Sequence, residues 1–334
     1  MSVMLGTIDK NSTTDQFKLT SRFFPSKVGG MPAWLDFKHI PDATEMTCSK
    51  CNVPLVFLCQ LYAPIDEPEF RGSCFHRTLF VFFCYDCRND RTFLVLRSQL
   101  RVQNEYYSDV PAEPSDPDKT PDMWGVKLCK VCGCKALEDY ENIYCSLYHK
   151  NVDDRSSSDN NLVVLPEYII NEEADDDEYP DGSSASEDEE SNDDENSEVV
   201  IPKGSLQDVD NLDEALLEMA YGGDQDDEYF EKFKTTIASV PEQIIRYDRL
   251  GKPLWVCAKS IPATNDIPPC SYCGKQRQFE FQIMPQVLYY LKLPEITNEE
   301  SFNFGVLAVY TCPDSCSVGS KQYKEEFLWQ QSSL

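Results

Sequence analysis

The stretch CSKCNVPLVFLCQLYAP at residues 48–64 opens with a C-x2-C pair and passes directly into an apolar segment. A second pair, Cys84-x2-Cys87, follows the apolar run LFVFF at residues 79–83. Two turns that each present two cysteines can supply the four thiolates of a tetrahedral zinc site. The pattern therefore predicts β-strands joined at one end by a structural zinc ion, with the ligands Cys48, Cys51, Cys84 and Cys87.

The same arrangement recurs near the end of the chain. The second set of predicted ligands, spaced as C-x2-C and C-x3-C, is Cys270, Cys273, Cys312 and Cys316. In both copies a phenylalanine lies six residues, and a glutamine nine residues, after the second cysteine of the leading pair. The segment LFVFFC at 79–84 matches LAVYTC at 307–312. Each copy of this internal repeat predicts one β unit with its own zinc ion; buried free cysteines or a redox pair are the alternative.

Short apolar runs bounded by Pro, Gly, Asn and Asp are typical of β-strands. They lie at Pro54–Tyr62, Thr78–Cys84, Thr92–Leu96, Phe279–Met284 and Val306–Thr311. Phe230, Phe233 and Ile237 mark one face of a helix. We therefore expect a mainly β fold with a few helices, of the α+β class. Residues 1–110 and 228–334 are predicted to form two pseudo-repeated, zinc-stapled β domains.

Residues 128–150, LCKVCGCKALEDYENIYCSLYHK, form a third cysteine-rich segment. The predicted ligands of a further zinc ion are Cys129, Cys132, Cys145 and His149. The segment resembles a shortened MYND-type finger that keeps the first and third ligand pairs of the full finger. Cys134 is an alternative ligand, and a finger without metal is the alternative state. The whole chain is therefore expected to bind two or three structural zinc ions.

Residues 156–205 differ in composition from the rest of the chain. The chain has 58 acidic and 30 basic residues, a formal charge of −28, and 15 of the acids lie within residues 172–198. Such a segment buries too little apolar area to offset the entropy of ordering it, so we expect a disordered acidic linker. The charge favours basic partners and a monomer, and it disfavours direct binding to nucleic-acid phosphates.

Residues 206–221 predict a short amphipathic helix after the linker. Its apolar positions are Val209, Leu212, Leu216, Leu217 and Met219. Such a helix can pack against the body of the protein, or it can serve as a leucine-rich nuclear export signal, and the spacing fits both.

Several function classes are disfavoured by what the sequence lacks. There is no run of 18 apolar residues, and residues 1–10 do not resemble a signal peptide, so we expect no membrane segment and a protein of the cytosol or nucleus. In that reducing compartment, fifteen cysteines favour metal binding over disulfides. The three histidines form no H-E-x-x-H motif, and glycine-rich phosphate-binding motifs are absent. We therefore expect a binding protein and no enzyme.

Further segments carry a family resemblance. They read VGGMPAWLD (28–36), FHRTLFVFFCYDC (75–87), RYDRLGKPLW (246–255), CSYCGKQRQFEFQIMPQVLYYL (270–291) and FNFGVLAVYTCPDSC (302–316). Together they resemble the programmed cell death protein 2 family. The resemblance implies a dedicated chaperone that captures a small-subunit ribosomal protein, ribosomal protein S2, and supports small-subunit assembly. It also implies shuttling between cytoplasm and nucleus.

Polar and aromatic residues near the repeats are candidates for a groove that binds the client. They are Trp34, His76, Arg77, Arg246, Trp255, Arg277, Phe279 and Gln282. The alternative for the aromatic residues is a place in the core, and the alternative for the arginines is an internal salt bridge. An alternative function is a zinc-finger scaffold that recruits peptide motifs to regulatory or transcriptional complexes.

Overall fold

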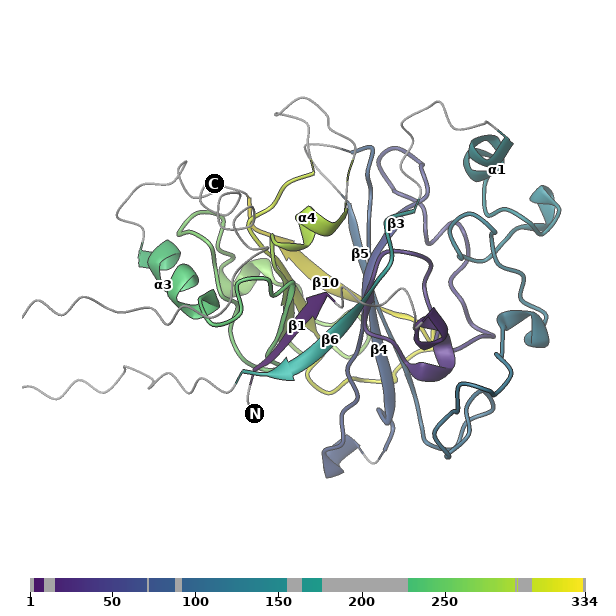
Figure 1. The fold of residues 1–334 in the computed structure, drawn as a ribbon, viewed down its shortest axis with the longest axis horizontal. Coiled ribbons are helices and arrows are strands. Elements are labelled where there is room, and N and C mark those ends of the chain that lie inside the picture. The colour runs from purple at the N-terminus through teal and green to yellow at the C-terminus, as the bar shows by residue number, and fades with distance from the viewer. Residues whose placement is uncertain are drawn as a thin grey trace, which may run out of the picture.

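The strands of the chain close into one barrel. The computed structural model describes residues 3–8, 16–70, 72–87, 92–154, 164–175, 228–291, 293 and 302–332. In this part of the chain the strand order is β1–β6–β2–β3–β4–β5–β10–β9–β8–β7. The strands are β1 (Met4–Ile8), β2 (Lys27–Val28), β3 (Val56–Tyr62), β4 (His76–Phe83), β5 (Phe93–Leu100), β6 (Tyr168–Ala174), β7 (Ile245–Tyr247), β8 (Gln278–Ile283), β9 (Leu307–Thr311) and β10 (Lys324–Gln330). Figure 1 shows β1 and β6 crossing the same face of the molecule.

The helices are few and short, which confirms the predicted mainly β class. The α-helices are α1 (Leu147–Asp154), α3 (Glu228–Ile237) and α4 (Val287–Leu291). The 3-10 helices are η2 (Gln16–Leu19), η3 (Ser21–Phe23), η4 (Pro68–Phe70), η5 (Pro121–Trp124), η6 (Glu138–Tyr140) and η7 (Thr264–Asp266). Figure 1 places α1 and α3 at opposite ends of the molecule. Among the described residues, no helix combines the length and the apolar character needed to cross a membrane.

The barrel has an internal two-fold arrangement that follows the sequence repeat. The first copy contributes the meander β2–β3–β4–β5, and the second contributes β7–β8–β9–β10. β5 pairs with β10 on one side. On the other side β1 and β6 pair with each other, and they also pair with β7 and β2 respectively. The first strand of the chain therefore lies beside a strand of the second copy.

A β-bulge occurs at the same place in both copies. The register between β3 and β4 shifts between Phe57 and Cys59. The register between β8 and β9 shifts between Phe279 and Phe281. The pairing of the two copies that the sequence predicts, with Phe57 on Phe279, is therefore also the structural equivalence.

One hydrophobic core fills the barrel and draws on both copies. Its buried residues include Val56, Leu61, Leu79 and Val81 from the first copy and Phe281, Ile283, Leu307 and Val309 from the second. Phe83 stacks on Phe302 with ring centroids 4.4 Å apart. Burial of apolar surface stabilises by about 25 cal/mol per Å². A shared core of this kind therefore holds the two copies together as one body.

Buried ion pairs also connect the two copies. Arg77 on β4 makes a bidentate contact with Glu280 on β8, at 2.5 and 2.8 Å, and both side chains are fully buried. Arg97 on β5 lies 2.8 Å from one carboxylate oxygen of Glu326 on β10. The other oxygen of Glu326 accepts a bond from Arg277 at 3.0 Å. Since an unpaired buried charge is very costly, each copy depends on the other to neutralise its charges.

The structure corrects the start of the predicted disordered linker at residues 156–205. Residues 168–174 within this range form β6, which pairs with both β1 and β2. The reason is the apolar run LVVLPEYII at residues 162–170, which supplies buried Leu165 and Ile170 to the core. The prediction used the average composition of residues 156–205, in which the acidic residues outweigh this short apolar run. Residues 156–163 and 176–205 of the linker, and the helix predicted at 206–221, lie outside the described residues.

Candidate metal centres

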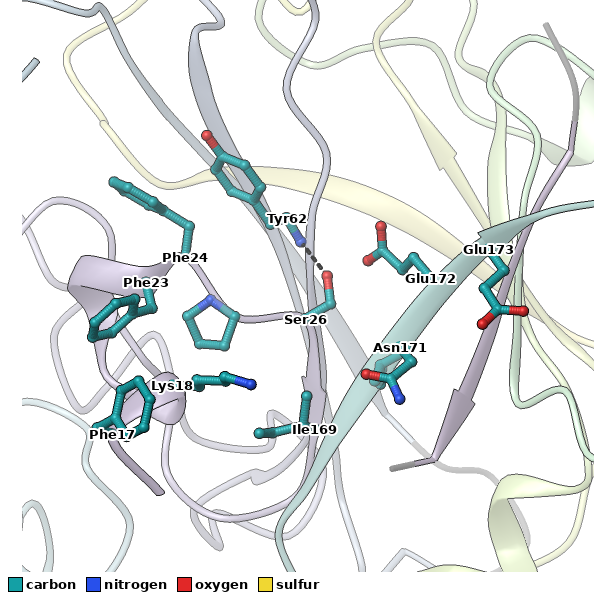
Figure 2. Close-up of a pocket in the computed structure, with 12 residues that line it drawn as sticks. Phe17, Lys18, Phe23, Phe24, Ser26, Tyr62, Ile169, Asn171, Glu172 and Glu173 are labelled. Atoms are coloured by element: carbon teal, nitrogen blue, oxygen red, sulfur yellow. Dashed lines mark hydrogen bonds between the residues drawn. The ribbon is translucent and has the colours of Figure 1, made fainter. Parts of the chain in front are cut away.

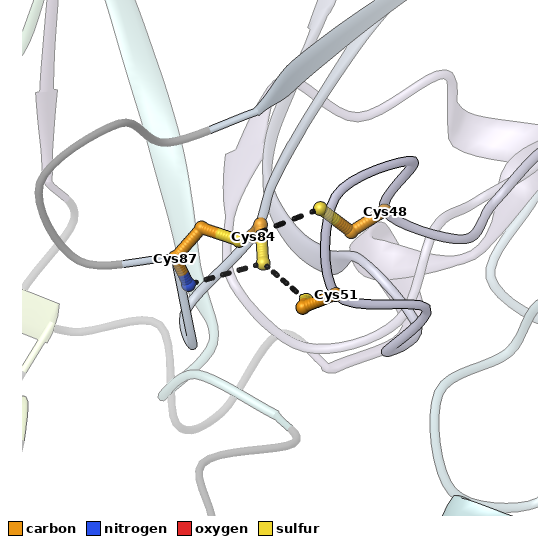
Figure 3. Close-up of side chains that lie close together, drawn as sticks. All are labelled: Cys48, Cys51, Cys84 and Cys87. Atoms are coloured by element: carbon orange, nitrogen blue, oxygen red, sulfur yellow. Dashed lines mark hydrogen bonds between the residues drawn. The ribbon is translucent and has the colours of Figure 1, made fainter.

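The structure brings the predicted metal ligands together as three groups of four. They are Cys48, Cys51, Cys84 and Cys87; Cys129, Cys132, Cys145 and His149; and Cys270, Cys273, Cys312 and Cys316. Within each group the ligand atoms all lie within 4.8 Å of one another. Figure 3 shows how the two cysteine pairs of the first group face each other. Cys134 is not a member of the finger group, so His149 completes that site.

The sulfur–sulfur distances fit a tetrahedral ion. A zinc–sulfur bond of about 2.3 Å places two thiolates about 3.8 Å apart in a tetrahedron. In the first group Cys48 and Cys87 are 3.7 Å apart, and Cys51 and Cys84 are 3.4 Å apart. The corresponding distances in the last group are 3.7 and 3.5 Å. Four thiolates at this separation form the donor set and size of a structural zinc site.

The finger group combines three thiolates with one imidazole. Cys132 and Cys145 have their sulfur atoms 3.6 Å apart. His149, at the third position of α1, places Nδ1 3.0 Å from the sulfur of Cys145 and 3.7 Å from that of Cys129. All four ligands are buried. These distances fit a Cys3His zinc site, in which the nitrogen lies slightly closer to the metal than the sulfur atoms do.

The finger is packed against the first copy of the repeat. Trp34 donates its indole N–H to the carbonyl oxygen of Gly133 at 2.7 Å. A Cβ atom on Gly133 would lie 2.8 Å from Met31, so no side chain fits at this position. Cys129 and Tyr144 share one hydrophobic cluster with Trp34. The metal at this site would therefore also stabilise the outer surface of the first copy.

All three leading C-x2-C pairs adopt the same turn. The residue after the second cysteine has a positive φ, which favours glycine or asparagine. These residues are Asn52 (57°), Gly133 (72°) and Gly274 (77°). The first cysteine N–H then donates to the carbonyl five residues later, at 2.7–2.9 Å in the three turns. The pattern C-x2-C-[GN] is visible in the sequence, so it could have strengthened the prediction of three equivalent metal-binding turns.

The thiols of the first group differ in their pKa values. Burial raises the pKa of Cys48, but a hydrogen bond with Thr92 and the backbone N–H groups of Lys50 and Cys51 outweigh it, and the pKa falls to about 6. Burial raises the pKa of Cys84 in the same group. Zinc binding requires all four thiolates, so it would release protons and would weaken as the pH falls.

The last metal group is linked to the buried ion pairs through its second turn. Arg77 donates to the hydroxyl of Ser315 at 2.9 Å. Gln99 donates to the carbonyl of Ser315 at 3.0 Å, and Arg97 donates to the carbonyl of Cys316 at 3.1 Å. The turn between the ligands Cys312 and Cys316 therefore accepts hydrogen bonds from two buried arginines of the first copy.

We expect the purified chain to carry three zinc ions. Each group offers four protein ligands within 4.8 Å of one another, enough to complete a four-coordinate zinc ion, so none depends on a second molecule. Native and denaturing mass spectrometry of the same sample should differ by the mass of three ions. Cys132→Ser should reduce the number to two. A chain that is folded and carries no metal would contradict this prediction.

The residues that were predicted to line a client groove do not share one surface. Trp34, Arg77, Phe279 and Gln282 are at most 4% exposed. His76, Trp255 and Arg277 are 5–9% exposed, and Arg246 pairs with Asp175 at 2.9 Å. Their contacts are internal. Polar and aromatic residues also form such buried contacts, so their residue types alone do not distinguish a binding site from the interior.

One of these residues, Gln282, and its repeat equivalent Gln60 reveal a second repeated motif that sequence reasoning missed. Gln60 accepts a hydrogen bond from the N–H of Ala33 at 2.9 Å, and Gln282 accepts one from the N–H of Leu254 at 2.6 Å. Both acceptors therefore fix the segment G-x-P-x-W, which reads GMPAW at 30–34 and GKPLW at 251–255. The two segments stand 14 and 15 residues before their metal-binding turns, so alignment of the copies further upstream would have found them.

His76 is expected to make the stability of the fold depend on pH. Its Nδ1 lies 3.0 Å from the hydroxyl of Tyr62, while its buried Nε2 has no partner among the described residues. Burial lowers the pKa of His76 to about 4. Between about pH 6.5 and 4 the unfolded chain therefore binds a proton that the folded chain does not bind. As the pH is lowered through this range, the free energy of unfolding decreases by up to about 1.4 kcal/mol per pH unit.

The check is urea unfolding of the wild type and of His76→Phe between pH 7 and 4. We expect a shallower pH dependence for the variant. His39→Gln, which replaces a largely exposed ring, is the matched control. Equal pH dependence for the wild type and His76→Phe would contradict the prediction.

Comparison with known proteins gives matches over both copies of the repeat. Residues 2–114 match the family model of the programmed cell death protein 2 N-terminal domain, and residues 227–332 match that of the C-terminal domain. Programmed cell death protein 2 of Rattus norvegicus is 37% identical over 346 residues, which cover 99% of this chain and 96% of the relative. The Mus musculus protein is 38% identical, with 94% and 93% covered. Programmed cell death protein 2-like of Homo sapiens is 31% identical, with 87% and 85% covered. No solved structure gives a significant match.

Proposed function

The chain belongs to the programmed cell death protein 2 family, and from this premise we propose that it is a non-enzymatic escort for a basic ribosomal protein. The client that the family resemblance implies is ribosomal protein S2 of the small subunit. The escort would bind its client in the cytoplasm as a monomer, keep it soluble and accompany it toward the nucleus during small-subunit assembly.

The position of the acidic residues carries this proposal. Of the total charge of −28, 15 acids lie within residues 172–198. This run begins on β6, so its first members, Glu172 and Glu173, belong to the wall of the barrel. Extensions of ribosomal proteins are basic because they bind RNA phosphates. A concentrated negative field attracts such segments quickly, in a manner that depends on salt.

The metal centres support a binding role. Each group has four cysteine or histidine ligands. Four protein ligands fill a tetrahedral zinc ion and leave no coordination position for water, which a catalytic zinc requires. The ions would instead make the barrel and finger rigid, and a rigid surface loses less entropy when it binds a client.

The test is recovery of the client from cell extract. The tagged full-length chain is used at about 0.15 M salt, and bound proteins are identified by mass spectrometry. One variant lacks residues 176–198, which removes 12 of the 15 acids and leaves β6 complete. A control of unchanged length carries the amide in place of each of these 12 acids.

We expect one basic small-subunit ribosomal protein to dominate the recovered material. Recovery should fall to a similar extent in the deletion and in the amide variant, because both remove the same charge. Recovery of no ribosomal protein by the unmodified chain would contradict the proposal.

The finger supports a second candidate function, recruitment of peptide motifs to regulatory complexes. Apolar side chains on and beside the finger are exposed, with Met123 at 64% and Leu147 at 55%. This candidate predicts regulatory proteins in place of a ribosomal protein. Their recovery would be lost with Leu147→Ser and would not change when residues 176–198 are deleted.

A further inference from the structure

A groove lies beside the exposed end of β6. It has a volume of about 600 Å³ and is bounded by β6 on one side and by η2, η3 and the following residues on the other. Figure 2 shows Phe17 and Phe23 on one wall, with Glu172 and Glu173 on the strand opposite. The groove thus has an apolar wall and an acidic rim, and the side chain of Lys18 lies between them.

The backbone of β6 is only partly paired along this groove. On one edge, β6 pairs with β1 from Ile170 to Ala174. On the other edge, β2 pairs only with Tyr168 and Ile169, and the N–H of Ile170 donates to the carbonyl of Ser26 at 2.9 Å. Beyond that point no strand among the described residues lies beside this edge, so residues 171–174 offer an open edge toward the groove.

The sequence before β2 explains why the pairing stops. Pro25 has no N–H to donate to a partner strand. Phe24 has a φ of 48°, a left-handed conformation that turns the chain away from β6. The rings of Phe17 and Phe23 meet edge to face, 5.3 Å apart, on the wall that this turn creates. The open edge is therefore fixed by local sequence, and a strand could be added there without displacing β2.

The acids at this edge lack cationic partners. Glu172 and Glu173 are exposed, and neither forms an ion pair with another described residue. The displacement of water around Glu172 raises its pKa, against the effect of a hydrogen bond with Ser26. Ser26 also accepts a hydrogen bond from the N–H of Tyr62 at 2.9 Å. Because both side chains are exposed at this edge, a guanidinium or ammonium group placed here can pair with them directly.

We propose that the open edge of β6 binds an extended basic segment of the client by strand addition. The inference rests on the proposed function, which supplies a basic client. Backbone groups of the segment would pair with β6 beyond Ile170, and an arginine or lysine side chain would meet Glu172. Glu173 points to the opposite face of the strand and would meet a side chain at an adjacent position of the segment. Apolar side chains of the segment would pack on the wall of Phe17 and Phe23. Strand addition of this kind gives affinity through the backbone and selectivity through alternate side chains.

The test uses the full-length zinc-loaded chain and a fluorescein-labelled peptide of about ten residues that alternates arginine and valine. In one peptide every valine is N-methylated, and in another every arginine is N-methylated. Because alternate residues of a strand direct their N–H groups to opposite edges, only one edge of the peptide can pair with β6. We therefore expect one methylated peptide to bind at least about tenfold more weakly and the other to bind within about twofold of the parent.

The variant Glu172→Lys should weaken binding of the parent peptide by at least about tenfold, and Glu172→Gln should have a smaller effect. The matched control is Asp139→Lys, an identical change of charge at an exposed site in η6 of the finger. It should change the affinity by less than about twofold. Zinc content and thermal unfolding show that each variant is folded.

Equal binding of both methylated peptides, or unchanged affinity of Glu172→Lys, would overturn the strand-addition site. Binding of the peptide only after residues 206–221 are deleted would also overturn it, because a segment of the chain itself would then be the occupant. Extract recovery separates this inference from the proposed function. If Glu172→Lys captures the ribosomal protein as well as the wild type, the escort function stands and the site fails. If the wild type captures none, the escort function fails whatever the peptide result.

Discussion

Cys273→Ser in the zinc-loaded chain is expected to reduce the zinc content from three ions to two and to unfold the second copy of the repeat. Cys273 is only partly buried and lies outside the hydrophobic core, so the substitution itself leaves the core unchanged. Zinc in a structural site contributes on the order of 10 kcal/mol. This is comparable to the whole stability of a typical domain, 5–15 kcal/mol. The loss should therefore exceed that of any single core substitution.

The loss of structure should also affect the first copy, through the turn that ends at Cys316. Ser315 and the carbonyl of Cys316 accept hydrogen bonds from Arg77, Gln99 and Arg97. Without the metal this turn is no longer fixed, and buried donors of the first copy lose their acceptors. Hydrogen exchange should therefore become faster in β5 as well as in β9 and β10.

Two variants serve as controls for this prediction. Cys132→Ser removes the zinc ion of the finger, which contributes no strand to the barrel, so protection of β5 and β10 should remain. Cys257→Ser changes a buried cysteine outside the three groups and should retain three ions. Unchanged exchange of β5 and β10 in Cys273→Ser would show that the last metal group does not support the barrel.

Glu280→Gln is expected to lower the free energy of unfolding by about 3–5 kcal/mol. The substitution keeps the size of the side chain but leaves the fully buried Arg77 without a counter-charge. Glu280 also accepts bonds from Tyr247 at 3.0 Å and from Thr311, so several donors lose a charged acceptor. Urea unfolding at pH 7 measures the change.

The matched control is Glu105→Gln, whose partner Lys38 is exposed. An exposed pair contributes at most about 1 kcal/mol, so this control should remain close to the wild type. The double variant with Arg77→Met and Glu280→Gln should recover part of the loss, because it removes the orphaned charge. A loss for Glu280→Gln no larger than that of the control would contradict the prediction.

The difference between Glu280→Gln and the wild type should disappear in acid. Burial alone would raise the pKa of Glu280, but the charge of Arg77 outweighs it and holds the pKa below its usual value. For a carboxyl group whose folded pKa is lowered, the stabilisation is present above the unfolded pKa of about 4.3. It is lost as the pH falls through the folded pKa. The two unfolding curves should therefore approach each other below about pH 4.

The sequence predicts the local units of this fold well because their chemistry is local. The spacing of the cysteines predicts the C-x2-C turns. The apolar runs that end at Phe83 and Thr311 form β4 and β9. The equivalence of Phe57 and Phe279 follows from the repeat and persists in the bulges of β3 and β8. The spacing of the finger cysteines predicts its four ligands but leaves Cys134 as an alternative, which the structure excludes from the group.

The closure of the barrel could not be predicted in the same way. β1 and β6 are short, isolated strands that no repeat marks, and β6 is followed by a strongly acidic run. The arginines show a related difficulty, because Arg77 meets its partner Glu280 more than two hundred residues later in the chain. A charged residue in a strand normally suggests a surface, and only the complete fold shows that these charges neutralise each other in the core.

The pairing of β1 with β7 has a consequence for the time course of synthesis. β1 is made before the rest of the barrel, and its partner Ile245–Tyr247 is made more than 230 residues later. At ordinary rates of translation this delay is roughly 10–50 s. Until then the edges of β1 and β5 have no partner, and such edges invite pairing with other chains. Translation that stops before β7 therefore yields a nascent chain that can aggregate and cannot form the barrel. Synthesis of β7 to β10 determines when the barrel can close.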